Sequence, residues 1–251
     1  MARTMAEDHN QFDLAAWAEK DSPWALAETA VVNLGRVYLY GPPGVGKTAL
    51  ALKAGSQPLS ITLSEDLCVQ EMMGHYVPGD SHWEFHYGPI STAFKEGRVL
   101  VLNEVGRASG AVHDFLLAVL DRNDVARITI PSGETLQPGV GLKVIATGNN
   151  APDDLDPALR SRFEAEVHLP TPNPQLLRKL DAEYPGLGQA LANSFTDPER
   201  ALDPRRLLSF VNLLRAGVAL RTAAGLSFGN RAPDVLAAFS AAGVTFPCDR
   251  S

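Results

Sequence analysis

The fold follows from one stretch, Gly41-Pro42-Pro43-Gly44-Val45-Gly46-Lys47-Thr48, which fits the pattern G-x-x-x-x-G-K-[ST]. The apolar run Val37-Tyr38-Leu39-Tyr40 precedes it and Ala49-Leu50-Ala51-Leu52-Lys53 follows it, which predicts a strand, a loop and a helix in that order. Glycines let such a loop fold into a concave nest of inward-pointing N–H groups, and the helix start adds the positive end of its dipole. A triphosphate is the natural occupant of this loop.

Two side chains of the loop complete the predicted site. Lys47 is placed to reach the β- and γ-phosphates, and the Thr48 hydroxyl to bind Mg²⁺. The expected cofactors are therefore ATP and Mg²⁺, although no residue near the loop distinguishes ATP from GTP. The candidate nucleotide-binding residues are Gly41, Pro42, Pro43, Gly44, Val45, Gly46, Lys47, Thr48 and Ala49.

Composition limits the class of protein. The 251 residues are 45% hydrophobic and carry a formal charge of −7, which predicts a globular chain of one large or two modest domains and argues against broad nucleic-acid binding. No signal peptide or membrane-spanning run is apparent, so we expect a cytoplasmic protein. Cys68 and Cys248 lie far apart without metal-type spacing, which favours reduced thiols.

Strand and helix patterns alternate along the first two thirds of the chain. Strands are predicted at 36–40, 58–63, 99–102, 143–147 and 165–169, helices at 23–33, 46–55, 89–95, 109–122 and 156–163, a helix cap at 64–66, and hairpins at 75–87 and 127–136. This alternation is typical of an α/β fold with a parallel sheet flanked by helices.

Strand signals stop at the proline-rich segment 169–174, and helices follow. We therefore expect an N-terminal helical extension at 1–35, with a short amphipathic helix around Phe12–Trp17, an α/β core at 36–171, and a small α-helical domain with a tail at 172–251.

Three predicted strands end in polar segments: Gly41–Thr48, Asn103-Glu104 and Asn149. Ligands of open parallel sheets bind outside the carboxyl ends of the strands, so these segments should meet at one edge. A carboxylate there can orient and deprotonate a water opposite the metal, which makes Glu104 the candidate catalytic base. The alternative for Glu104 is a capping or salt-bridged surface residue.

The order of motifs resembles the AAA+ ATPases, and within them the MoxR/CbbQ-like, dynein-related branch, which carries a hairpin inserted in its second helix. The likeness runs from about Arg36 to Leu220. Its carriers are Gly41–Thr48 (Walker A), Gly88-Pro89-Ile90, Val99-Leu100-Val101-Leu102-Asn103-Glu104-Val105-Gly106-Arg107-Ala108 (Walker B and its tail), Val144–Asn149, Leu155–Phe163 and Asp203-Pro204-Arg205.

One position departs from the family pattern. The family has Asp-Glu at the end of the Walker B strand, and this chain has Asn103-Glu104. Asn keeps an acceptor oxygen but loses the charge, so we expect Thr48 and Asn103 to hold Mg²⁺ less tightly and turnover to be slower.

The resemblance implies further site residues. Asn149 resembles the sensor 1 residue, with Asn150 as its competitor and a plain turn role as the alternative. Arg205 resembles the sensor 2 arginine of the helical lid, with Arg206 as its competitor and a surface arginine as the alternative.

Two arginines compete for another role. Arg162 resembles the arginine finger that reaches a neighbouring subunit's nucleotide, and Arg160 could share or take that role. The alternative for each is a surface ion pair near Glu164 or Glu166.

The resulting expectation is a Mg²⁺-dependent ATPase ring of identical chains, by resemblance six, that acts as a chaperone-like remodeller of a partner protein. By resemblance, that partner is often a protein with a von Willebrand factor A domain. The alternatives are a nucleotide-gated assembly scaffold with weak or no hydrolysis and a nucleic-acid-associated NTPase motor. In the hairpin, the spacing of His75, His82 and His86 fits no standard metal site, and Trp83-Phe85-Tyr87 is either hairpin packing or a surface that grips a substrate.

Overall fold

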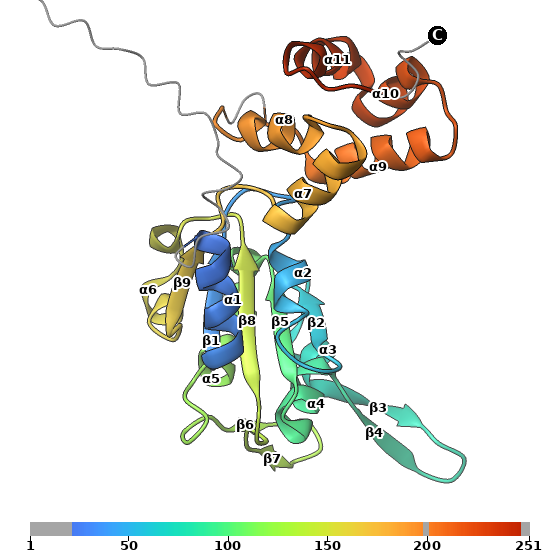
Figure 1. The fold of residues 1–251 in the computed structure, drawn as a ribbon. Coiled ribbons are helices and arrows are strands. Elements are labelled where there is room, and N and C mark those ends of the chain that lie inside the picture. Colours follow the sequence, from blue (N-terminus) through green and yellow to red (C-terminus); the bar gives the residue numbers. More distant parts are fainter. Residues whose placement is uncertain (1–21, 198–200, 247–251) are drawn as a thin grey trace, which may run out of the picture. The chain divides into compact units, whose positions relative to one another are not determined.

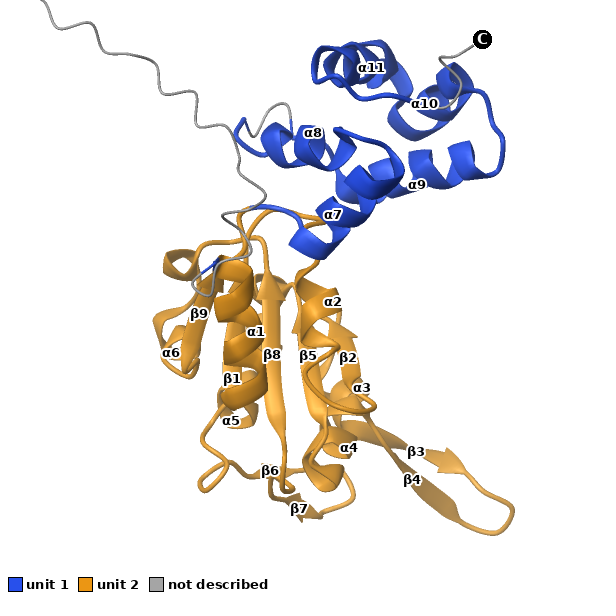
Figure 2. Ribbon diagram, in the orientation of Figure 1, with its two compact units in different colours: residues 1–22, 171–251 blue, residues 23–170 orange. Residues whose placement is uncertain are grey.

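A computed structural model describes residues 22–197 and 201–246 of the chain. These residues form two compact units, the first along the chain spanning Pro23–Pro170 (orange in Figure 2) and the second beginning at Thr171 (blue). The predicted amphipathic helix around Phe12–Trp17 and the position of Cys248 lie outside the described residues.

The first unit contains an α/β core with two hairpins (Figure 1). Its elements are α1 (Pro23–Asn33), β1 (Arg36–Tyr40), α2 (Lys47–Ala51), β2 (Leu59–Thr62), α3 (Val69–Met73), β3 (Gly74–Pro78), β4 (Trp83–Tyr87), α4 (Pro89–Glu96), β5 (Val99–Asn103), η2 (Val105–Arg107), α5 (Gly110–Val119), β6 (Ile128–Thr129), β7 (Thr135–Leu136), β8 (Lys143–Gly148), η3 (Pro152–Asp154), α6 (Pro157–Arg160) and β9 (Ala165–His168).

The main sheet has five strands in the order β2-β5-β8-β1-β9, and every pair is parallel. β1 lies between β8 and β9, with Leu39 opposite Thr147 and Val167. α1 packs on β1 and β9, α2 on β5 and β8, and α4 on β2 and β5. Because helices cover the sheet, β5 is buried along its whole length, as its continuous apolar run predicts. The α/β fold expected from the sequence is confirmed.

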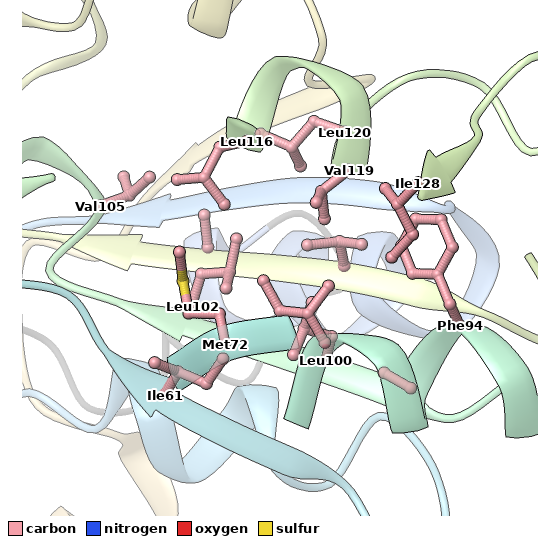
Figure 3. Close-up of a cluster of buried hydrophobic side chains, with 14 of the residues drawn as sticks. Ile61, Met72, Phe94, Leu100, Leu102, Val105, Leu116, Val119, Leu120 and Ile128 are labelled. Carbon is pink, nitrogen blue, oxygen red and sulfur yellow. The ribbon is translucent and has the colours of Figure 1, made fainter. Parts of the chain in front are cut away.

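The core of this unit joins the sheet to α4 and α5 (Figure 3). Phe94 of α4, Leu100 and Leu102 of β5, and Leu116 and Val119 of α5 are all fully buried. Burial of one such side chain contributes about 1.5–3 kcal/mol, so this cluster fixes β5 beneath the two helices. The carboxyl end of β5 is thereby held in place.

The second unit is helical. It contains α7 (Pro174–Glu183), α8 (Leu187–Ser194), α9 (Pro204–Arg215), α10 (Leu220–Phe228), η4 (Gly229–Arg231) and α11 (Ala232–Ala241). Phe210, Phe228, Phe239 and Phe246 form an aromatic centre, with ring centroids of Phe210 and Phe228 5.4 Å apart. This core is separate from that of the α/β unit.

Several predicted boundaries differ from the structure. α1 packs on the sheet and belongs to the α/β unit, whereas the sequence placed it in an extension ending at residue 35. The predicted cap at 64–66 is wrong, because α3 begins only at Val69 and the Glu71 side chain accepts from the N–H of Cys68. α2, α5 and α6 end earlier than predicted.

Candidate functional site

The loop after β1 has the shape that its glycines predict. Gly41, Gly44 and Gly46 have φ angles of 141°, 80° and 115°, which side-chain-bearing residues rarely adopt. A Cβ at Gly41 would lie 2.3 Å from the carbonyl oxygen of Leu169, so glycine is required where the loop passes the end of β9.

The loop offers main-chain donors that are not used within the described part of the chain. Among the described residues, the N–H groups of Gly44, Val45 and Gly46 donate to no hydrogen bond. Unpaired backbone donors gathered in a concave loop suit an anion with several oxygens. The residues present therefore fit a nucleotide's phosphates.

Lys47 lies folded back over the loop and is 6% exposed. Its Nζ donates to the carbonyl oxygens of Gly41 and Pro42, at 2.7 and 2.8 Å, and to Oδ1 of Asn149 at 2.9 Å. A buried ammonium needs such acceptors to offset the loss of water. These contacts place the charge of Lys47 between the loop and the end of β8.

Asn103, at the end of β5, is held from both sides of its amide. Its Oδ1 accepts from the hydroxyls of Thr48, at 2.7 Å, and Thr147, at 3.1 Å. Its Nδ2 donates to Oγ of Ser60, at 2.8 Å, and to the carbonyl oxygen of Ile61, at 3.2 Å. The orientation of the amide is thus determined, with the oxygen toward the loop. Oxygen ligands of this kind suit Mg²⁺, so the residues fit that ion as well.

Glu104 follows directly with φ 57° and ψ 46°, in the left-handed region. Its two carboxylate oxygens lie 3.3 and 3.5 Å from Nδ2 of Asn149. A residue with a Cβ pays about 1 kcal/mol or more for this conformation, and such backbone strain clusters at functional sites. The carboxylate thus lies beside Asn149, and the role of Glu104 as a catalytic base stays a prediction.

Sequence reasoning missed three contributors to this edge of the sheet. Ser60 and Thr147 orient Asn103, and the Tyr38 hydroxyl donates to the carbonyl oxygen of Asn150 at 2.8 Å. Thr147 is 2% exposed, and a polar residue within an otherwise apolar buried strand is a signal that could have revealed it. The Asn150 side chain has no hydrogen bond among the described contacts, whereas Asn149 joins Lys47 to Glu104.

The two candidate finger arginines, one the last residue of α6 and the other two positions later, differ in their partners. Arg160 donates to both carboxylate oxygens of Glu166, at 2.7 and 3.0 Å, and to Asp153. Arg162 donates to Oδ1 of Asp121 at 3.1 Å. Neither joins the hydrogen-bonded group around Lys47. The ion pair with Glu166 is the alternative that the sequence offered for Arg160.

Arg205 and Arg206 lie in the helical unit, exposed at the start of α9. Asp203 caps this helix by accepting from the N–H of Arg205 at 2.9 Å. The role of Arg205 at a nucleotide stays a prediction.

The β3–β4 hairpin carries the exposed aromatic side chains. Trp83 is 65% exposed, whereas Phe85 packs edge-on against Tyr76 and Tyr87, with centroids 5.2 and 5.3 Å apart. Phe85 thus matches the packing interpretation, and Trp83 faces solvent. Over residues 22–197 and 201–246, no group of three His, Cys, Asp or Glu side chains is placed to hold a metal, and no helix is long and apolar enough to cross a membrane.

Comparison with known proteins identifies the family. A family profile described as an AAA domain of the dynein-related subfamily matches residues 36–163, which is more than half of the chain. The chain belongs to this family. Its resemblance to the MoxR/CbbQ-like, dynein-related branch of the AAA+ ATPases is confirmed by similarity to members of that branch.

Two relatives illustrate the extent of the match. Protein NorQ of Paracoccus denitrificans is 27% identical over 68% of this AAA+ chain, and protein CbbQ of Hydrogenophilus thermoluteolus is 24% identical over 68% of it. Each match covers 66% of the relative, so the chain spans just under two thirds of the length of either protein.

Solved structures support the same fold. The closed state of Hsp104 with ATPγS and casein matches 74% of this chain and 41% of its own, with a TM-score of 0.52 and 18% identity. At this identity the similarity shows the fold alone.

Proposed function

We propose that this AAA+ protein binds and hydrolyses ATP with Mg²⁺ as a ring of identical chains, and uses the cycle to remodel a partner protein. The observation that supports this most is the convergence of Lys47, Thr48, Asn103, Glu104 and Asn149 on one glycine-lined loop. These residues come from three strand ends, and their types suit phosphoryl transfer to water.

Each residue has a distinct task in this proposal. The loop amides and Lys47 hold the phosphates, and Thr48 and Asn103 hold the metal, which when bound neutralises charge on the phosphate oxygens. Glu104 accepts the proton of the attacking water at its carboxylate. Asn149, which contacts both Lys47 and Glu104, keeps that carboxylate aligned with the loop.

A ring follows from what one chain supplies. Within the described residues, the hydrogen-bonded group around the loop contains a single cation, Lys47. Phosphoryl transfer proceeds faster when a guanidinium balances the developing charge, and an arginine from the next chain can provide it. A head-to-tail contact of this kind closes into a ring, and the family resemblance favours six chains.

The partner is proposed from resemblance. A von Willebrand factor A-type protein is the first candidate, and co-purification of the tagged chain followed by mass spectrometry tests it. A nucleic-acid motor is disfavoured by the formal charge of −7.

One observation supports a second candidate function, a nucleotide-gated scaffold that hydrolyses slowly or not at all. Asn103 brings no negative charge to the metal position, and all of its amide contacts are to neutral groups. Weaker metal binding would slow turnover without preventing nucleotide-dependent assembly.

Phosphate release and binding of a fluorescent ATP analogue distinguish the two functions. For an ATPase, Glu104→Gln lowers the turnover number at least about 100-fold while binding persists, because the substitution removes the base and keeps the shape. Glu65→Gln, the same change at an exposed turn, is the control. EDTA should abolish release in the wild type. Equal release by Glu104→Gln and the wild type would reject the assignment, and binding without release by the wild type would favour the scaffold.

A further inference from the structure

Arg160 ends α6 and Arg162 lies two residues later, yet their guanidinium groups have different hydrogen-bond partners. All three nitrogens of Arg160 donate to Glu166 and Asp153, residues of its own subunit. Among the residues that the structure describes, the guanidinium of Arg162 makes one hydrogen bond, from Nη1 to Asp121. A forked pair backed by a second carboxylate is strong, whereas a single bond is easily exchanged.

The Nε of Arg162 adds a second observation. It is buried and has no hydrogen-bond partner among the described residues. The position of Arg162 on Asp121 therefore leaves donors unused, which makes it a resting position. Phosphate oxygens accept two parallel bonds from a guanidinium and would satisfy those donors.

Asp121 itself is firmly placed. Arg36, at the first position of β1 and 4% exposed, donates to the carbonyl oxygens of Leu120, at 3.0 Å, and Asp121, at 2.5 Å. Its Nη2 also donates to Oδ1 of Asn123 at 2.6 Å. The chain after α5 is thus fixed to the central sheet, and the carboxylate of Asp121 stays opposite Arg162.

We propose that Asp121 is a positioning residue that holds Arg162 in the resting chain and releases it to the triphosphate of a second copy, while Arg160 remains part of its own subunit. This inference rests on the ring proposed above and assigns its shared arginine. The side chain of Arg162 is 37% exposed and that of Asp121 29%, so solvent already weakens their ion pair. A nucleotide tail with several negative charges competes well against one carboxylate.

Nucleotide-dependent self-association tests the proposal without depending on hydrolysis. Sedimentation velocity with Mg²⁺ and ATPγS gives the protein concentration at half-assembly for each variant. Asp121→Asn should lower this concentration about threefold, since the cost of breaking an exposed ion pair is removed. Asn keeps an oxygen for the Arg122 N–H, which donates to Oδ1 of Asp121 at 3.0 Å, and Asp121→Ser is a second variant with the same expectation.

Asp124→Asn is the matched control, because it removes the same charge three residues away, where Asp124 pairs with Arg122. It should assemble at the wild-type concentration. Arg162→Gln should raise the concentration at least about tenfold, while binding of a fluorescent ATP analogue by the single chain persists.

The outcomes separate this inference from the proposed function. A wild type that binds ATPγS but stays monomeric rejects the ring, and this inference with it. Assembly of the wild type with no change in Asp121→Asn and Asp121→Ser rejects the role of Asp121 alone. Loss of assembly in Arg160→Gln but not in Arg162→Gln overturns the choice between the arginines.

Discussion

Asn103 is the residue at which the sequence pattern and the structure give different expectations. By family pattern, an aspartate here would restore the usual charge. In the structure, Nδ2 donates to the Ile61 carbonyl and to Ser60, so the end of β2 offers acceptors that match an amide. An aspartate here would place a carboxylate oxygen, which cannot donate, against the carbonyl oxygen of Ile61.

We therefore expect Asn103→Asp to lower the free energy of unfolding by about 1–3 kcal/mol, the cost of a lost buried hydrogen bond. Urea denaturation measures the change. Asn150→Asp, which adds the same charge at an exposed position of this edge, is the control and should change stability far less. Equal stability of the two variants would show that β2 does not select the amide.

The left-handed backbone of Glu104 allows the effect of its conformation on stability to be separated from the effect of its carboxylate on activity. Glu104→Gly and Glu104→Ala both remove the carboxylate, and only glycine is relaxed at φ 57°. We expect the free energy of unfolding of Glu104→Gly to be about 1 kcal/mol higher than that of Glu104→Ala. Both variants should be inactive in phosphate release. If Glu104→Ala is the more stable of the two, the left-handed conformation costs nothing.

At the residue scale, the sequence predicted which side chains meet at this edge of the sheet but not their orientation. Lys47, Asn103 and Asn149 follow from strand ends and a motif. The side to which the Asn103 amide turns depends on Ser60 and Thr147, which lie 43 and 44 residues away and approach only through the strand order.

At the element scale, β1 and the end of β8 are joined by Tyr38. This side chain is fully buried, and its hydroxyl donates to the carbonyl oxygen of Asn150. Burial, with a smaller contribution from Glu104, raises the pKa of Tyr38 above its ordinary value of 10.0. The folded chain therefore keeps this proton at pH values where the unfolded chain has lost it.

The sign of the effect follows from this difference. The unfolded state binds fewer protons above pH 10, so the free energy of unfolding should fall as pH rises beyond that value. Tyr38→Phe should lower stability by about 1 kcal/mol at pH 7 and flatten the fall above pH 10. Denaturation at pH 7 to 11 measures both, with Tyr76→Phe on the exposed hairpin as control. An unchanged slope would contradict the assignment.

Strands were easier to predict than helix ends. β5 contains the continuous apolar run Val99–Leu102 and β8 the shorter run Val144–Ala146, and such runs are typical of buried parallel strands. α3 misled the prediction, because Ser64-Glu65-Asp66 forms a turn and the helix begins after Cys68. The capping box forms further along the chain, where the Glu71 side chain accepts from the N–H of Cys68 at 3.0 Å.

At the scale of the whole molecule, two separate hydrophobic cores predict two unfolding transitions. Residues 171–251 contain no tryptophan, so in a Trp17→Phe background tryptophan fluorescence reports on the α/β unit, where Trp24 is 2% exposed. Phe239→Ala should destabilise the helical unit by about 3–5 kcal/mol. In this variant, part of the helical circular dichroism should be lost at lower denaturant concentration, while the fluorescence transition stays where it is in the wild type. Coincident shifts of both signals would show a single cooperative unit.

The sequence predicted the passage from strands to helices at residues 169–174, because proline clusters and the loss of alternating patterns mark it. It did not predict that α1 packs on β1 and β9, because nothing in the sequence of 23–33 indicates which element this helix contacts. Contacts between distant segments need the strand order, which composition and spacing do not contain.

The position of Lys47 has a consequence for phosphate binding. Its ammonium is already surrounded by two carbonyl oxygens and an amide oxygen. A phosphate that binds here replaces these neutral partners of Lys47, so the ammonium does not have to lose a shell of water when the phosphate binds. Binding of a nucleotide is then an exchange of ligands around Lys47, within a loop that its three left-handed glycines already curve.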